Sequence, residues 1–150
     1  KIRQGCNNQD SLGSPTYSNM FCYHCKHLET VVNKSWGYHL ILDCNGCDSL
    51  AIRNEELLVK WIGDLVERIN MKAHGDPIIT YNGEQPYHSG YTVVQIITTS
   101  SIVAHFIDEP ASVYLDVFSC KTFDPQIVKD IMREYFDISN YKEYYLSRQA

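Results

Sequence analysis

Two stretches decide the fold of this chain: GYTVVQIITTSSIVAHF at residues 90–106 and LDVFSC at residues 115–120. β-Branched and aromatic residues dominate both stretches, and such residues favour strands. They predict neighbouring strands over residues 91–98, 102–107 and 113–119. This arrangement places a serine at position 100, a histidine five residues later and a cysteine fifteen residues after that on adjoining strands.

The flanking sequence adds two helices and more strands. Asn54 has the chemistry of an N-cap, and after it apolar residues recur at helical spacing to about Asn70. Asp124 and Pro125 form the cap and first-turn pair that opens a second helix. Strands are predicted over residues 36–44 and 78–81, and the aromatic tail at 141–145 adds an edge strand. This order predicts an α+β fold, an antiparallel sheet with two helices on one face.

Such a fold leaves the second face of the sheet without a covering layer. Large apolar sheet faces rarely stay exposed to water, because their burial is favourable. We therefore expect a homodimer in which this face packs against a second copy of the chain.

Length and composition point to one folded domain. The chain has 150 residues, 44% of them hydrophobic, which is enough for one core. Residues 1–35 have little periodicity and contain a cysteine/histidine segment, FCYHCKH at 21–27, so an N-terminal arm is expected there. The folded domain is expected over residues 36–150.

Charge and hydropathy exclude several classes of function. The net charge of −5 argues against a nucleic-acid partner, which would need a basic face. No apolar run is long enough to span a membrane, and the N-terminus is polar rather than signal-like. Six cysteines without a secretory signal fit a reducing compartment, so a cytoplasmic protein is expected.

The residue order around Ser100 carries the functional prediction. The relevant residues are, in chain order, Thr99, Ser100, Ser101, His105, Asp108, Glu109 and the DVFSC run that ends at Cys120. This order and spacing resemble the small prokaryotic S-adenosylmethionine decarboxylases. The resemblance implies a sandwich of that family's type over the decarboxylase domain, residues 36–150. It also implies self-cleavage before an internal serine, which becomes a pyruvoyl group that forms a Schiff base with the substrate, so no bound coenzyme is needed.

Matched residue by residue, the resemblance assigns roles. Ser100 is the pyruvoyl precursor, His105 the processing base and Cys120 the proton donor to the product. Thr92 stands at the position of the family's processing serine and keeps a hydroxyl. Glu109 matches the carboxylate that holds the ribose hydroxyls of the substrate.

The sequence also departs from the family pattern. The family's glutamate before the cut is Thr99 here, and its histidine after the cut is Ser101. The adenine-stacking aromatic has no direct match, and Tyr87 or His88 is the expected replacement. The changes around the cut leave a second reading open, a non-processing homologue that acts as a binding or regulatory module.

The substrate is likewise left between two classes. The first is S-adenosylmethionine, whose product feeds polyamine and spermidine biosynthesis. The second is a basic amino acid, ornithine or arginine, because the CNGC run at 44–47 and the closing Arg148-Gln149-Ala150 look most like bacteriophage homologues, some of which are thought to use such substrates. A phage-encoded enzyme would work in the host cytoplasm.

A separate cysteine pattern raises the question of a metal. Cys22 and Cys25 form one C-x-x-C pair, and Cys44 and Cys47 form another after eighteen intervening residues. This spacing fits a four-cysteine structural zinc site that pins the arm to the domain. Free thiols and a disulfide are the alternatives.

Overall fold

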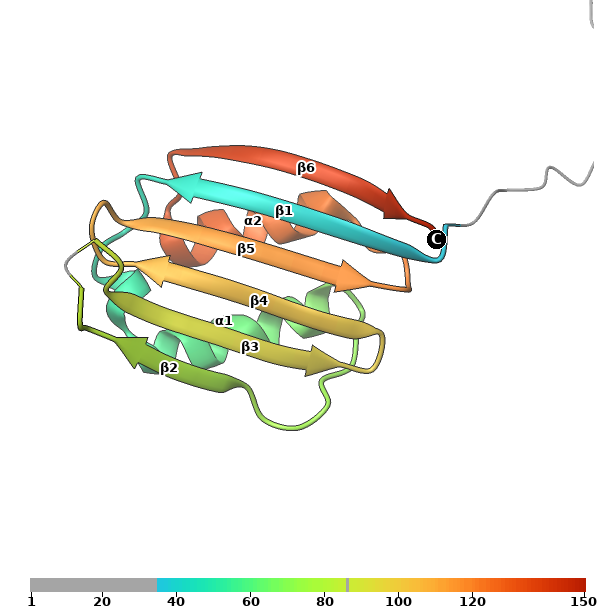
Figure 1. Cartoon of the computed structure of the whole chain (residues 1–150), viewed down its shortest axis with the longest axis horizontal. Helices are drawn as coiled ribbons and strands as arrows, with labels where there is room; N and C mark the ends of the chain where they lie inside the picture. Colours follow the sequence, from blue (N-terminus) through green and yellow to red (C-terminus); the bar gives the residue numbers. More distant parts are fainter. Residues whose placement is uncertain (1–34, 86) are drawn as a thin grey trace, which may run out of the picture. The chain divides into compact units, whose positions relative to one another are not determined.

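The computed structural model describes residues 35–85 and 87–150, and its strands form one antiparallel sheet (Figure 1). The sheet has six strands in the order β2-β3-β4-β5-β1-β6. The strands are β1 (Gly37–Asn45), β2 (Ile78–Asn82), β3 (Gly90–Ile97), β4 (Ser100–Ile107), β5 (Ser112–Ser119) and β6 (Asn140–Arg148). The helices are the short 3-10 turn η1 (Ala51–Arg53), α1 (Glu55–Arg68) and α2 (Pro125–Phe136).

Helix α1 begins where its sequence provides a cap. The Asn54 side chain accepts a hydrogen bond from the backbone N–H of Leu57 at 3.1 Å. Glu55 and Glu56 occupy the first turn, where negative charge complements the helix dipole. The inner face then buries Leu58, Trp61, Ile62, Leu65 and Val66.

Helix α2 uses a similar start. Asp124 accepts from the N–H of Gln126 at 2.8 Å, and Pro125 fills the first helical position, where no N–H is needed. The helix ends at Asp137, whose backbone is left-handed with φ of 46°. Its apolar stripe packs on the same side of the sheet as α1, and the Trp61 ring lies 5.4 Å from the Phe136 ring between the two helices.

Alternation along each strand sends one set of side chains to the helices and the other to the opposite face. On β1, for example, Leu40, Leu42 and Cys44 are buried under the helices. Both helices lie behind the sheet in Figure 1, so the predicted α+β fold with two helices on one face is confirmed.

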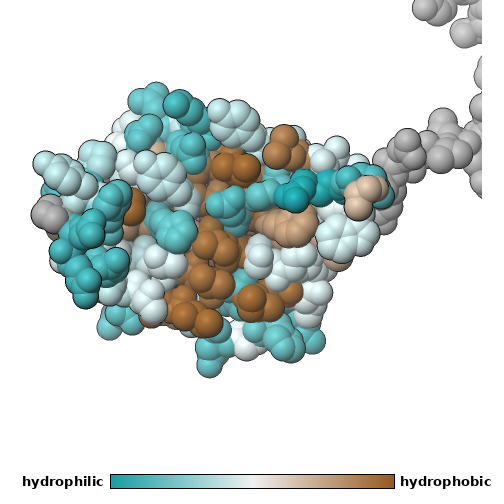
Figure 2. All heavy atoms as spheres, in the orientation of Figure 1, coloured by the Kyte–Doolittle hydropathy of each residue, from teal (hydrophilic) through white to brown (hydrophobic). Residues whose placement is uncertain are grey.

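The other side of the sheet, called here the open face, is partly apolar. Figure 2 views it directly and shows a hydrophobic band across its middle. Strand register places these large exposed side chains on that face: Ile78, Ile96, Tyr114, Tyr144 and Leu146. Among residues 35–85 and 87–150 no element covers this apolar sheet face, which is the observation behind the dimer prediction.

The predicted elements are all present, with two differences. Strand β4 begins at Ser100 rather than at residue 102, because Ile97 pairs directly with Ser100 and the turn is only Thr98-Thr99. The tail strand β6 is longer than predicted. It pairs along the whole of β1.

The N-terminal arm predicted over residues 1–35 lies outside the described residues, except for residue 35 itself. In the described part of the chain, neither helix is both long and apolar enough to cross a membrane.

Candidate functional site

The tight turn between β3 and β4 holds Ser100 in an unusual conformation. Ser100 has φ of 150°, a region of backbone space that residues other than glycine rarely adopt. It pairs with Ile97 on β3 and with Ser119 on β5. The peptide bond between Thr99 and Ser100 is thus held at a strained position between two strands.

The carbonyl of that peptide bond is hydrogen-bonded from the neighbouring strand. The backbone N–H of Cys120 donates to the Thr99 carbonyl oxygen at 3.0 Å. The Cys120 side chain is exposed and follows directly after β5. The predicted precursor and the predicted proton donor therefore lie at the same end of the sheet.

The predicted processing pair lies elsewhere. Thr92 and His105 face each other across β3 and β4, and Thr92 Oγ1 is 3.0 Å from His105 Nδ1. His105 is exposed on the open face between buried Ala104 and Phe106. Five residues of extended strand separate His105 from Ser100, roughly 16 Å at about 3.3 Å per residue.

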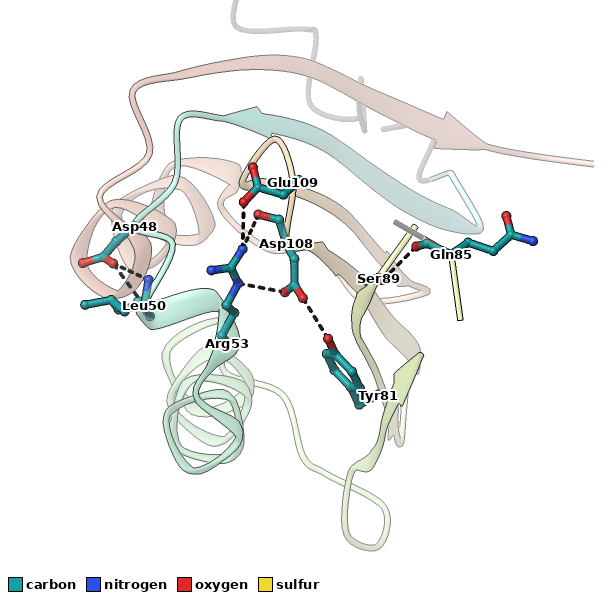
Figure 3. A network of polar contacts seen from close by, with 9 residues as sticks. Asp48, Leu50, Arg53, Tyr81, Gln85, Ser89, Asp108 and Glu109 are labelled. Carbon is teal, nitrogen blue, oxygen red and sulfur yellow. Dashed lines mark hydrogen bonds and ion pairs between the residues drawn. The ribbon is translucent and has the colours of Figure 1, made fainter. Parts of the chain in front are cut away.

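Glu109 lies farther still from Ser100. It follows the end of β4, where Arg53 forms ion pairs with two consecutive carboxylates, Asp108 and Glu109 (Figure 3). The Arg53 guanidinium donates to Glu109 Oε1 at 3.2 Å and to the backbone carbonyl of Asp108 at 2.9 Å, and its Nε lies 3.2 Å from Asp108 Oδ1. The other Asp108 oxygen accepts from the Tyr81 hydroxyl at 2.9 Å.

This network leaves Asp108 and Glu109 with different abilities to bind a ligand. Asp108 is largely buried: one oxygen accepts from Tyr81, and the other lies within ion-pair distance of Arg53 Nε but accepts no hydrogen bond within the described residues. Its hydrogen bond with the Tyr81 hydroxyl is the main cause that raises the pKa of that tyrosine. Glu109 is well exposed and keeps one oxygen free of Arg53.

The expected replacements for the stacking aromatic lie at the Glu109 end as well. Tyr87 and His88 belong to the loop between β2 and β3, and both are exposed. That loop joins Asn82 to Gly90, and Gly90 pairs with Ile107. A Cβ on Gly90 would come within 1.8 Å of the Phe106 carbonyl oxygen, so this close approach of β3 and β4 requires glycine.

The predicted residues therefore fall into two groups within one chain. The first, called the catalytic end, contains Ser100 and Cys120. The second, called the recognition end, contains Glu109, Tyr87 and His88. Thr92 and His105 lie between them, on the open face and nearer the recognition end.

A pocket that the sequence did not predict lies near the catalytic end. It has a volume of about 450 Å³ and is lined by Trp36, Phe118, Arg148, Gln149 and Ala150. The Arg148 guanidinium lies 5.3 Å from the Phe118 ring and close to His39, whose Nε2 is 2.8 Å from Asp116 Oδ1. Phe118 pairs with Ser101 and precedes Cys120 by two residues. No sequence signal linked these residues, because the three chain segments meet only through the pairing of β1 with β5 and with β6.

The cysteine pattern does not form a metal site within the described residues. No group of three or more potential ligands occurs there, and Cys22 and Cys25 lie outside the range. Cys44 and Cys47 are buried unpaired thiols. Burial, with a smaller effect of Cys47, raises the pKa of Cys44 to about 12, and burial raises the pKa of Cys47 to about 11. The described residues therefore give no support to the predicted zinc site.

Comparisons with known proteins agree with the predicted fold and family. The family model for S-adenosylmethionine decarboxylase matches residues 38–149. S-adenosylmethionine decarboxylase proenzymes of two Clostridium botulinum strains, Hall and Loch Maree, are 28% and 29% identical over 99 and 100 residues, covering 65% of this chain and 81% of each relative. The crystal structure of the adenosylmethionine decarboxylase from Aquifex aeolicus VF5 superimposes with a TM-score of 0.63 at 22% identity, covering 77% of this chain and 92% of that one.

These matches define the class of the protein, a pyruvoyl-dependent carboxy-lyase. The chain belongs to the S-adenosylmethionine decarboxylase family, because the family model spans most of its length.

Proposed function

We propose that this protein is a self-processing decarboxylase that converts its own Ser100 into a pyruvoyl group and acts on S-adenosylmethionine. The observation that carries the proposal is the strained turn: Ser100 has φ of 150°, and the preceding carbonyl already accepts a hydrogen bond from Cys120 N–H. A donor aimed at that oxygen can stabilise negative charge that develops on it during attack.

The cleavage step needs no outside reagent other than water. The Ser100 hydroxyl oxygen bonds to the Thr99 carbonyl carbon, the C–N bond breaks, and the hydroxyl proton passes to the nitrogen, which gives an ester. Loss of the Ser100 α-proton then expels the Thr99 carboxylate and leaves dehydroalanine. This residue tautomerises to an imine, and water replaces its nitrogen, which leaves as ammonia, to give the pyruvoyl group. The strain at Ser100 favours the first step, because breaking the peptide bond releases it.

The proton transfers in this scheme require a base close to Ser100. His105, oriented by Thr92 at 3.0 Å, has the chemistry for this role but lies roughly 16 Å away along the strand. We propose that His105 of a second copy supplies it. A two-fold axis that lies between two open faces and runs across the strands would bring the middle and recognition end of one sheet over the catalytic end of the other.

The same dimer accounts for the separation of Glu109 from the catalytic end. In this arrangement Glu109, Tyr87 and His88 of one copy would face the pocket and Ser100 of the other. Burial of the apolar open face supplies the driving force for association. Each active site would then contain residues from both copies.

Decarboxylation itself draws on the cofactor and one side chain. A pyruvoyl carbonyl supplies an electron sink for a substrate whose α-amine has condensed with it. Cys120, exposed at the same end of the sheet, is placed to return a proton to the α-carbon after CO₂ leaves.

Two observations favour S-adenosylmethionine over a basic amino acid. The Trp36 and Phe118 rings, 6.0 Å apart, line the pocket beside the catalytic end and suit a flat purine. At the recognition end Asp108 is already occupied by Arg53 and Tyr81. The remaining free oxygen of Glu109 suits a hydroxyl donor such as ribose.

This function fits a role in polyamine and spermidine synthesis, in the cytoplasm of a cell or of a phage host. Ornithine or arginine turnover is the alternative reaction. A non-processing binding or regulatory module is the alternative class, motivated by Thr99 and Ser101 at the two positions beside Ser100 that depart from the family.

Mass spectrometry of the denatured protein tests the proposal. We expect two chains, residues 1–99 and residues 100–150, with the second carrying a carbonyl in place of its amino group. Ser100→Ala should remain a single chain. A wild-type protein that stays intact after prolonged incubation would support the non-processing module instead. Supply of S-adenosylmethionine, ornithine and arginine at equal concentration to the cleaved protein then identifies the substrate by its product.

A further inference from the structure

The Thr98-Thr99 turn is held by a segment that comes from elsewhere in the chain. Residues 70–74, called here the bracket segment, follow α1 and run beside the end of β3. The backbone contacts are His74 N–H to the Ile96 carbonyl at 2.8 Å, Thr98 N–H to the Lys72 carbonyl at 2.9 Å and an antiparallel bridge between Ala73 and Ile97. The bracket segment thereby continues the sheet up to the turn that contains the predicted cleavage point.

One side chain of the bracket segment contacts both the turn and the end of β5. Met71 Sδ accepts a hydrogen bond from Thr99 Oγ1 at 3.1 Å, and Ser119 Oγ lies 3.8 Å from the same sulfur. Thr99 carries the predicted scissile carbonyl, and Ser119 precedes Cys120. A single thioether therefore links the residue to be cleaved with the strand that donates to its carbonyl.

A second contact fixes the Cys120 side of this arrangement. The Lys121 ammonium donates to the Asn70 carbonyl oxygen at 2.6 Å, and Lys121 N–H donates to Ser119 Oγ at 3.0 Å. The bracket segment is therefore attached on both sides of the hydrogen bond between Cys120 N–H and the Thr99 carbonyl.

We infer that Met71 is a positioning residue for self-cleavage. This inference rests on the proposed function, since it concerns the rate of the proposed cut. By accepting from the Thr99 hydroxyl, Met71 limits rotation of Thr99 and keeps its carbonyl directed at Cys120 N–H. Orientation of this kind matters because a hydrogen bond to the developing oxyanion weakens steeply when its angle departs from linear.

The contact also suggests how the chain tolerates its departure at position 99. Thr99 has a short side chain with a hydroxyl, and that hydroxyl is used within the protein rather than left to solvent. Met71 is half-buried and packs against the core, so its sulfur is held in place by the fold. The partner that fixes the turn is thus a residue of the bracket segment that follows α1, far from position 99 in sequence.

The test is a double-mutant cycle on cleavage rate. Met71→Leu keeps the volume and removes the acceptor, and Thr99→Val keeps the shape and removes the donor. The full chain is made by cell-free synthesis with timed quenching, and the intact and cleaved forms are separated by denaturing electrophoresis. Each single variant should cleave about fivefold more slowly, the size expected for loss of one modest hydrogen bond. The double variant should be no slower than either single one.

Controls separate positioning from a general effect on folding. Met132→Leu makes the same chemical change in the buried core of α2 and should cleave at the wild-type rate. Turnover per cleaved chain should be unchanged in Met71→Leu, because the contact acts before the pyruvoyl group exists. Multiplicative effects in the double variant, or wild-type cleavage in Met71→Leu, would overturn the role of Met71. A wild-type chain that never cleaves would instead overturn the proposed function.

Discussion

Ser100 and His105 lie on the same strand, β4, five residues apart, so within one chain the histidine does not reach the serine. If a second copy supplies the base, two inactive variants should rescue each other. Ser100→Ala retains His105, and His105→Ala retains Ser100. We expect neither to cleave alone and His105→Ala chains to cleave when the two are co-expressed, up to the fraction present in mixed dimers.

The readout of this experiment is the mass of each chain, since a differential tag distinguishes the two variants. Cleavage of His105→Ala expressed by itself would remove the histidine from the proposed step. Absence of cleavage in mixed dimers confirmed by double pull-down would rule out a base from the second copy.

A charge at the centre of the open face should separate the dimer. Val103 lies on that face in the middle of β4, between Val94 and Asp116 of the neighbouring strands. Val103→Lys should sediment near 17.3 kDa rather than twice that mass, and it should lose cleavage at the same time. Val59→Lys on the exposed side of α1 makes the same change away from this face and should leave both properties intact. A wild-type chain that is monomeric at micromolar concentration yet cleaves would contradict the shared site.

Cys120→Ala should affect the two proposed reactions, self-cleavage and decarboxylation, to different extents. The variant keeps the backbone N–H that donates to the Thr99 carbonyl, so cleavage should proceed at close to the wild-type rate. It loses the thiol proton, so turnover per cleaved chain should fall by about a hundredfold or more, the usual scale for a general acid. Cleavage time courses and CO₂ release on the same sample measure the two effects. Equal loss of both would mean that the side chain acts in cleavage as well.

Glu109→Gln should affect substrate affinity more than chemistry. The amide keeps an oxygen for Arg53 but weakens acceptance from substrate hydroxyls, because hydrogen bonds to charged acceptors are the stronger ones. We expect KM for S-adenosylmethionine to rise about tenfold with kcat changed much less, and 5′-deoxy-5′-methylthioadenosine to weaken as a competitor in parallel. Unchanged KM for S-adenosylmethionine with a raised KM for ornithine or arginine would assign Glu109 to a cationic substrate.

The buried thiols should limit stability at high pH. Burial raises the pKa of Cys44 to about 12 from an ordinary value near 9, so the fold favours the neutral thiol. The contribution of the neutral thiol to the free energy of unfolding is therefore complete below pH 9 and declines as the pH rises from 9 towards 12. This loss approaches about 1.4 kcal/mol per pH unit for one such group.

Cys44→Ala removes this titration. Urea titrations at pH 7, 9 and 10 measure the free energy of unfolding. At pH 7 this free energy should be lower for the variant than for the wild type, because a buried side chain is truncated. Above pH 9 it should decline less steeply with pH in the variant than in the wild type. Parallel declines would mean that the thiol does not govern the alkaline limit.

The sequence predicted the elements well because local signals agreed with the tertiary fold. The caps at Asn54 and Asp124 and the alternation along β5 each specify their own structure without help from distant residues. The short turn before Ser100 was missed, because Thr98 and Thr99 lack the glycine or asparagine that marks two-residue hairpins. The backbone hydrogen bonds of the bracket segment hold this turn in place of the turn-forming residues that the sequence lacks.

The site was harder to predict for a geometric reason. The spacing of the motif predicted the order of the residues along the chain. It did not show that an extended strand holds residues at its two ends far apart, as β4 does for Ser100 and Glu109. The Arg53 pairing and the Trp36–Arg148 pocket arise from chain segments that adjoin only after folding, so no local pattern pointed to them.

The order of the sheet has a last consequence for a cut between Thr99 and Ser100. Strand β1 belongs to the first product yet lies between β5 and β6 of the second, and β3 of the first product pairs with β4 of the second. Strands of the two products alternate within one sheet, so the products would dissociate only if the sheet unfolded. Folding before the cut and refolding after it would therefore differ. A molecule denatured after the cut has to reassemble from two separate polypeptides, so its refolding rate would depend on protein concentration. Folding of the uncut chain has no such dependence.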